Sequence, residues 1–160
     1  MKKVFDYILS IHQKLNNFIQ LRWTKRRGKT NVFGRIVIIN PKNIILGNGC
    51  SINHGAYLNA FNPIHIGDDV TISAGAKLIS TGIDYKRWMR GKKQHTSGKG
   101  IWIGDHVWIG ANAIILENVS ITGEYVIIAA NAVVNKSIHE SFVLVGGCPA
   151  TIIKRFTDGE

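Results

Sequence analysis

The chain has 160 residues, a formal net charge of +10, and 17 glycines against 3 prolines. This length suffices for one domain with a buried core, and no apolar run approaches the ~20 residues that cross a bilayer as a helix. Residues 1–29 hold eight Lys or Arg and one acid, and residues 84–99 hold six more and one acid. Nucleic acid is one partner for such charge, but no recognition helix or RNA-binding motif accompanies it. We therefore expect no nucleic-acid binding.

Residues 3–24 are predicted to form an amphipathic helix within an N-terminal segment, residues 1–30. Its apolar positions recur at helical spacing on one face, which comprises Val4, Ile8, Ile11, Leu15, Phe18 and Ile19, with Phe5 and Arg22 at its edge. Trp23 and a basic cluster follow, made of Lys25, Arg26, Arg27 and Lys29. The helix would either lie on an anionic membrane surface or cover the open end of the domain that follows it. Either role would need this apolar face.

A six-residue repeat occupies residues 31–156. Its first runs are Leu46, Ile52, Leu58 and, after a two-residue slip at 63–65, Ile66, Ile72, Leu78. It returns as Ile103, Ile109, Ile115, Ile121, Ile127 and Val133, with Val107, Ala113, Val119 and Tyr125 four positions on. A period of six fits neither an α-helix nor a half-buried strand, and is typical of a parallel β-helix. An all-β fold of this type is therefore predicted, in preference to a strand pair in a sandwich.

The repeat is interrupted at residues 80–99, which are polar and basic and contain Trp88. A long excursion from a regular scaffold is more often functional than accidental, so we expect this loop to contribute to a site. Cys50 and Cys148 lie far apart and form no metal-spaced pair, and no signal peptide is recognisable. A reduced, cytoplasmic compartment is the simplest expectation, with peripheral attachment to the inner face of the membrane left open by the basic helix.

Three stretches carry a family resemblance: IGDHVWIGANAIIL, IIAANAVVNKSI and VGGCPATIIKR. They resemble the closing coils of hexapeptide-repeat acyltransferases, in the branch of galactoside, maltose, xenobiotic and surface-polysaccharide acetyltransferases. The resemblance implies a left-handed β-helix, a hand opposite to the usual rule for parallel crossovers. It also implies acetyl-coenzyme A as donor, a hydroxyl or amine of a sugar as acceptor, no metal, and a homotrimer with active sites between neighbouring coils.

Acetyl transfer to a hydroxyl needs a general base, and histidine suits that role near neutral pH. In the galactoside branch the base directly follows a Thr-Gly pair in the long loop, but here Thr81-Gly82 is followed by Ile83. We expect His95, the one histidine of the loop, to be the base, with His54 second and Asp84 as the nearest titratable neighbour. A solvated, non-catalytic His95 is the alternative. An amine acceptor would depend less on a base.

The same resemblance assigns residues to coenzyme A and to the acceptor. Ala111, Ala129 and Ala130 match positions along the pantetheine arm, although small residues at corners also serve packing. Asn135, Lys136 and Lys154 match positions near the nucleotide and phosphates, and Arg155 is an adjacent cation. Asn53 matches an acceptor-site asparagine, and Trp88 and Trp108 could stack on a sugar, although Trp108 could equally belong to the scaffold.

Two other functions fit the same coil. A γ-type carbonic anhydrase needs three zinc-binding histidines, two of them from a close His-x4-His pair. No two histidines here are five apart, which disfavours this function. A non-catalytic scaffold or membrane-associated assembly module would not need to bind coenzyme A.

Overall fold

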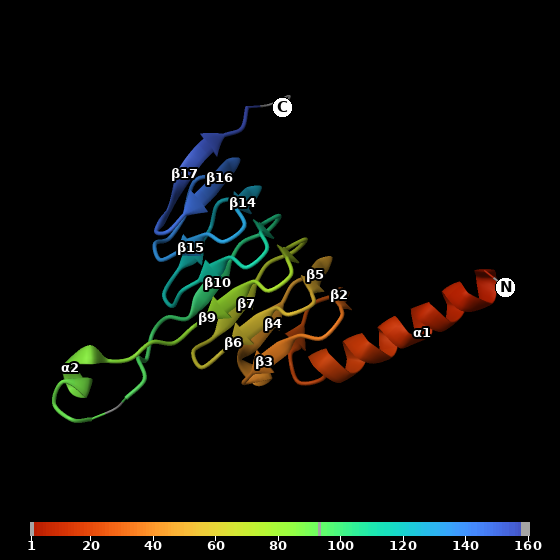
Figure 1. The fold of residues 1–160 in the computed structure, drawn as a ribbon, viewed down its shortest axis with the longest axis horizontal. Coiled ribbons are helices and arrows are strands. Elements are labelled where there is room, and N and C mark those ends of the chain that lie inside the picture. Colours follow the sequence, from red (N-terminus) through yellow and green to blue (C-terminus); the bar gives the residue numbers. More distant parts are fainter. Residues whose placement is uncertain (1, 93, 158–160) are drawn as a thin grey trace.

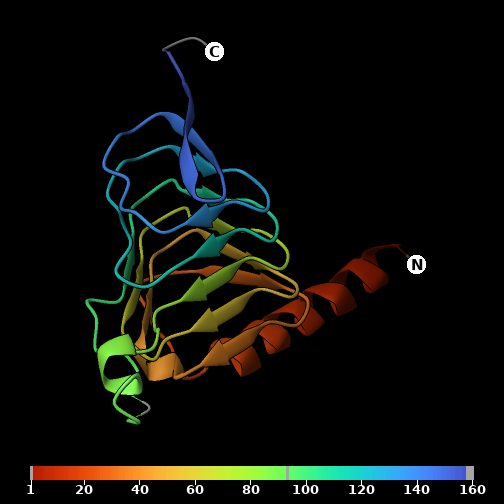
Figure 2. The ribbon, with the colours of Figure 1, turned by 60° about the vertical axis from the view of Figure 1, so that its left-hand side comes forward.

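The protein folds as a parallel β-helix preceded by one long helix (Figure 1). The structure, a computed structural model, describes residues 2–92 and 94–157. The helical elements of these residues are the long helix α1 (Lys2–Leu21), the single turn η1 (Pro41–Asn43) and the short helix α2 (Tyr85–Trp88). The strands stack into three faces, called sheets A, B and C below, so that successive coils lie one above another (Figure 2).

Sheet A contains β1 (Lys25–Arg26), β4 (Ile44–Leu46), β7 (Ile64–Ile66), β10 (Ile101–Ile103) and β13 (Ser120–Ile121). Sheet B contains β2 (Thr30–Phe33), β5 (Cys50–Asn53), β8 (Thr71–Ile72), β11 (Trp108–Ile109), β14 (Val126–Ile128), β16 (Val143–Gly147) and β17 (Ala150–Arg155). Sheet C contains β3 (Val37–Ile39), β6 (Tyr57–Asn59), β9 (Lys77–Ile79), β12 (Ile114–Ile115) and β15 (Val133–Val134). The pairings are parallel apart from β16 with β17, which form a closing antiparallel hairpin.

Aliphatic side chains at matching positions of successive coils form the core. Ile44, Ile64 and Ile101 pair in register on sheet A, and each is almost completely buried. Corners between the sheets turn with left-handed backbone, for example at Gly75 (φ +68°) and Asn112 (φ +57°), residue types that tolerate this conformation. Six residues therefore separate an inward-facing position on one face from the corresponding position on the next face.

The predicted repeat is confirmed as far as Ile121 and is wrong beyond it. Ile127 and Val133 are only half-buried and Tyr125 is exposed, whereas Val126, Ile128 and Val134 are buried. The turn after β13 contains one extra residue, ending at Tyr125 in left-handed backbone (φ +53°), and this moves the inward positions forward by one. The Tyr125 ring stacks between two neighbouring aromatic rings, those of His106 at 4.6 Å and Phe142 at 5.1 Å.

Helix α1 covers the edge strand β2 with the face that carries Asn17, Gln20 and Leu21, of which Leu21 is fully buried in the core. The side-chain oxygen of Asn17 accepts a hydrogen bond from the Val32 amide (2.8 Å), and that of Gln20 accepts one from the Ile36 amide (2.7 Å). The expectation that a covering helix would use the face of Ile11, Leu15, Phe18 and Ile19 is therefore wrong, because these four side chains are exposed. The side-chain amides of Asn17 and Gln20 satisfy unpaired backbone groups at this edge of the sheet, which aliphatic side chains could not do. The side chains of Val4, Phe5 and Ile8 lie outside the described residues.

The long loop leaves sheet C after β9 and returns at β10 on sheet A. Figures 1 and 2 show it projecting from the coil with α2 near its tip. In the part of the chain that the structure describes, no helix has the length and apolarity needed to cross a bilayer.

Candidate functional site

The base of the long loop is a short antiparallel ladder that brings His95 opposite Ile83. The Asp84 amide donates to the Gln94 carbonyl (3.0 Å), and the Thr96 amide donates to the Gly82 carbonyl (3.1 Å). These bonds flank the Ile83–His95 pair, which makes it a non-hydrogen-bonded pair whose two side chains lie on the same side of the ladder. The His95 imidazole therefore extends from the side of the ladder to which residue 83, the position after Thr-Gly, also directs its side chain.

Asn62 ties both ends of the loop to the coil beneath it. Its side-chain nitrogen donates to the Ser80 carbonyl (2.6 Å), where the loop begins, and to the Thr96 carbonyl (3.0 Å), where the ladder ends. Its backbone amide donates to the Ser80 hydroxyl (3.0 Å). Asn62 and Ser80 are both buried. Because buried polar groups are costly to leave unpaired, these bonds hold the loop base in one position.

Glu117, one coil further on, supports the same ladder from the other side. The Thr96 hydroxyl donates to the Glu117 carboxylate and accepts a hydrogen bond from the Gly82 amide (2.8 Å). A Cβ on residue 82 would come within 2.5 Å of a Glu117 oxygen, so the glycine leaves room for this carboxylate. Sequence reasoning missed Asn62, Thr96 and Glu117, because the contacts join positions up to 34 residues apart.

His95 is exposed and has an aromatic neighbour in Phe61, with ring centroids 4.9 Å apart and planes at 44°. Asp84, the other acid–base candidate of the loop, caps α2: its carboxylate accepts from the Arg87 amide (3.2 Å) and lies 3.6 Å from the Arg87 guanidinium. This arrangement gives Asp84 a role in shaping the loop. Trp88 lies on α2 and is exposed, away from the ladder contacts described above.

The three alanines assigned to coenzyme A lie on another edge of the prism, between sheets B and C. Ala111 and Ala129 are half-buried and Ala130 is exposed. The coils stack closely there, since the Asn131 amide donates to the Ala111 carbonyl (2.9 Å). His54 lies on the same edge, lower in the coil, and its carbonyl accepts from the Gly75 amide (3.0 Å). His54 thus shares an edge with the alanines, and His95 lies on the edge between sheets C and A.

The polar residues assigned to coenzyme A divide between two places. Asn135 and Lys136 are exposed and follow β15, on the same edge as the loop base. Lys154 and Arg155 lie on β17, where the Lys154 ammonium is 5.4 Å from the centre of the Phe156 ring.

Arg155 makes a two-pronged contact with Glu140, at 2.6 Å and 3.2 Å. This hydrogen bond and the nearby negative charge raise the pKa of Arg155 above its ordinary value. A phosphate would have to compete with Glu140 for this guanidinium.

Asn53 and Trp108 lie on sheet B, on strands that flank β8. The side-chain nitrogen of Asn53 donates to the Ile72 carbonyl (3.1 Å), and the Trp108 indole nitrogen donates to the Ser73 hydroxyl (2.9 Å). Both polar groups are thus engaged by the coil, while the Trp108 ring remains exposed and open to stacking.

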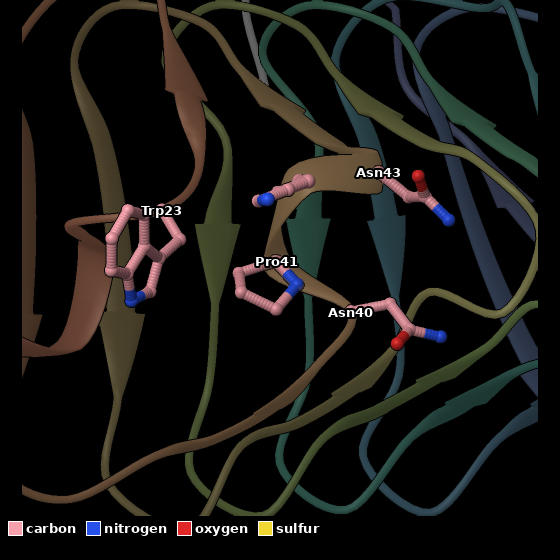
Figure 3. A pocket seen from close by; sticks show the side chains of 5 residues that line it. Trp23, Asn40, Pro41 and Asn43 are labelled. Carbon is pink, nitrogen blue, oxygen red and sulfur yellow. The ribbon is translucent and has the colours of Figure 1, made fainter.

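A cavity of about 460 Å³ opens at the first coil, between Trp23 and η1. Figure 3 shows Trp23 on one side and Asn40 and Asn43 on the other, with Pro41 between them. The Asn43 side chain donates to the Ala60 carbonyl (3.0 Å), which links this corner to the one that carries Phe61. Over residues 2–92 and 94–157, no three His, Cys, Asp or Glu side chains gather in a way that could hold a metal ion.

Comparisons with known proteins agree with this fold. Residues 100–136 match the family model described as bacterial transferase hexapeptide (six repeats). A hexapeptide-repeat-containing acetyltransferase of Vibrio cholerae O1 biovar eltor, solved in complex with acetyl-coenzyme A, superposes with a TM-score of 0.76 at 32% identity. The match covers 87% of this chain and 75% of that one.

Two relatives from Escherichia coli K12 are similar in sequence. Galactoside O-acetyltransferase is 30% identical over 116 residues, which is 72% of this chain and 56% of that protein. A candidate lipopolysaccharide biosynthesis O-acetyl transferase is 27% identical over 138 residues, covering 80% and 65% of the two chains. The chain thus spans roughly three fifths of the length of these curated relatives.

The three-sheeted coil, the repeat that builds it and the likeness to the Vibrio acetyltransferase over most of both chains lead to one assignment. The chain belongs to the hexapeptide-repeat acyltransferase family.

Proposed function

We propose that the protein transfers an acetyl group from acetyl-coenzyme A to a hydroxyl of a sugar in a surface polysaccharide or its precursor. The observation that carries this proposal is the ladder at the loop base, which holds His95 on the same side as residue 83. The similar Vibrio protein was solved with acetyl-coenzyme A, and the two similar E. coli proteins are named for a galactoside and for lipopolysaccharide biosynthesis. These names support a sugar acceptor.

Acetyl-coenzyme A supplies the activated acetyl thioester. A ring nitrogen of His95 would accept the proton of the acceptor hydroxyl as the hydroxyl oxygen attacks the thioester carbonyl carbon. The imidazolium would then return that proton to the leaving thiolate as the carbon–sulfur bond breaks, so the base is regenerated. Asn62, Thr96 and Glu117 would act by fixing the ladder, because proton transfer requires the imidazole within hydrogen-bonding reach of the hydroxyl.

The residues of this chain fit such a donor in part. Ala111, Ala129 and Ala130 leave a narrow, small-residue edge along which an extended pantetheine arm could approach the backbone. Lys154 offers a cation for phosphate on β17, although Arg155 is engaged by Glu140.

We also propose a homotrimer. In one chain the alanines and His95 lie on different edges of the prism, separated by the width of sheet C. A symmetric neighbour could bring the loop of one chain against the alanine edge of the next, which completes the site between two coils. A site divided in this way would need an assembly for activity.

A cytoplasmic location is part of the same proposal. The two cysteines are unpaired, with Cys50 buried and Cys148 exposed. Burial raises the pKa of the Cys50 thiol, whose sulfur lies 3.1 Å from the Gly67 carbonyl oxygen. Free thiols of this kind suit a reducing compartment.

The reaction can be tested with the purified chain, acetyl-coenzyme A and p-nitrophenyl β-galactoside, by following release of the coenzyme A thiol and the acetylated product by mass spectrometry. Calorimetry with coenzyme A alone separates binding from turnover. We expect coenzyme A to bind and a sugar hydroxyl to be acetylated. A chain that binds no coenzyme A would be a scaffold, and acetylation of amino sugars alone would replace the hydroxyl acceptor by an amine.

A further inference from the structure

Helix α1 presents an apolar stripe that the coil leaves uncovered. Ile11, Leu15, Phe18 and Ile19 share one face of the helix and are 48–63% exposed. The opposite face carries the amides that bond to β2 and the segment after it. The helix is therefore held on the protein in one orientation, with large hydrophobic side chains directed outward.

The end of this stripe meets a strongly basic surface. Phe18, Arg26 and Lys29 line one cavity of about 410 Å³, so apolar and cationic groups adjoin there. Arg22, Lys25 and Arg27 are exposed nearby in sequence. Among the described residues, the cavity beside Phe18 is lined by no Asp or Glu, whereas Arg27 lines another cavity together with Asp68, Asp105 and Glu124. The cations next to the stripe that lack an acidic neighbour in their cavity are therefore Arg26 and Lys29.

We propose that this surface, α1 together with residues 22–29, binds an anionic lipid bilayer as an interfacial helix. An exposed apolar face inserts at the boundary between headgroups and acyl chains, and adjacent cations bind anionic headgroups. A second copy related by a twofold axis suits the surface less well, because it would bring two basic clusters together. A threefold neighbour would meet the stripe with a different face, and the oligomeric mass measured below tests that case. The proposal concerns where the enzyme works and does not depend on the proposed reaction.

The placement of α1 determines how the enzyme would meet the membrane. In Figures 1 and 2 the helix runs from beneath the first coil and projects beyond the strands, and β17 lies at the opposite end of the coil. The first coils would therefore be nearest the bilayer. Trp23, exposed at the end of the helix, would lie at headgroup level, where tryptophan is favoured.

Co-sedimentation of the full chain with vesicles tests the proposal. We expect binding to phosphatidylcholine vesicles that contain phosphatidylglycerol, and weak binding to phosphatidylcholine alone. Each cation near an anionic surface contributes roughly fivefold to partitioning, so the double variant Arg26→Gln/Lys29→Gln should bind the anionic vesicles about thirtyfold less well. Phe18→Ser should weaken binding by about tenfold or more, since it removes one large inserted side chain.

Matched variants provide the controls. Arg90→Gln/Lys92→Gln removes the same charge from the exposed loop, and Ile153→Ser removes an exposed apolar side chain from β17; both should leave vesicle binding unchanged. Circular dichroism would show that each variant keeps the fold. Equal binding to both kinds of vesicle would overturn the proposal, as would Phe18→Ser binding like wild type. A change of oligomeric mass in Phe18→Ser, with no change in lipid binding, would instead show that another copy covers the stripe.

Discussion

The ladder at the loop base gives a direct test of the proposed base, by moving the histidine across the ladder. His95→Ala removes the imidazole, and His95→Ala/Ile83→His returns one on the opposite strand. Because residues 83 and 95 form a non-hydrogen-bonded pair, the new ring extends from the same side of the ladder. The second variant also restores the histidine to the place it occupies in the galactoside branch.

The expected magnitudes follow from this geometry. A general base contributes about 10²–10⁴-fold, so His95→Ala should lower kcat by that factor for a hydroxyl acceptor. Side chains of such a pair start about 5 Å apart at Cβ, and a different rotamer can recover much of this offset. Since a 1 Å misplacement can cost about a hundredfold, we expect the double variant to regain about tenfold of the loss.

The assay measures kcat and the KM for acetyl-coenzyme A with p-nitrophenyl β-galactoside, through release of the coenzyme A thiol. The KM for acetyl-coenzyme A should change little in both variants, because the base acts on the acceptor. Ile83→His alone is the matched control for the new side chain, and His95→Asn keeps the polarity without a usable base. His95→Asn should be as slow as His95→Ala.

Two outcomes would refute this reasoning. If His95→Ala keeps most of the wild-type kcat while His54→Ala loses it, the base lies on the edge that carries the alanines. If His95→Ala and His95→Asn are both slow and His95→Ala/Ile83→His regains nothing, the ladder does not direct residue 83 toward the acceptor. With an amine acceptor the loss in His95→Ala should be smaller and should shrink as pH rises.

Four further predictions address assembly, cofactor binding, loop support and the thiols. Light scattering should give the mass of three chains at micromolar concentration, and the mass of one chain at every concentration would contradict the proposed trimer. Lys154→Ala should weaken binding of acetyl-coenzyme A more than that of dephospho-coenzyme A, with both differences smaller at high salt, and equal weakening would mean that Lys154 does not contact the 3′-phosphate. Glu117→Ala should lower thermal stability, since hydrogen bonds to charged groups contribute about 1.5–3 kcal/mol. It should also lower kcat without changing coenzyme A affinity. Glu117→Gln, whose amide oxygen can still accept from Thr96, should recover thermal stability and kcat. In the native protein a thiol reagent should modify Cys148 at mildly alkaline pH and spare Cys50, whose pKa is raised by burial, until denaturant exposes it.

The coil was predictable because its signal is local and repeated. Leu46, Ile52 and Leu58, and again Ile103 to Ile121, are buried as the spacing required. The period failed at Tyr125 because the turn that ends there contains one extra residue. The chain is aliphatic at both Ile127 and Ile128, so composition alone could not show which of them faces inward.

The helix shows a different limit. Its amphipathic pattern was correct, but the sequence could not say which face the coil would bind. That was decided by the open edge of β2, whose backbone groups need hydrogen-bonding partners and find them in Asn17 and Gln20 rather than in aliphatic side chains. The same contacts leave the apolar stripe outside.

Local sequence patterns were enough to predict the repeat, the long loop and the histidine within it, because each involves residues close together along the chain. The fold was needed to place His95 opposite Ile83, to join Asn62 and Glu117 to the loop base, and to put the alanines on another edge. These arrangements could not be predicted because stacked coils bring together residues one or more coils apart along the chain. Contacts between coils depend on register, and a single inserted residue in a turn is enough to change it.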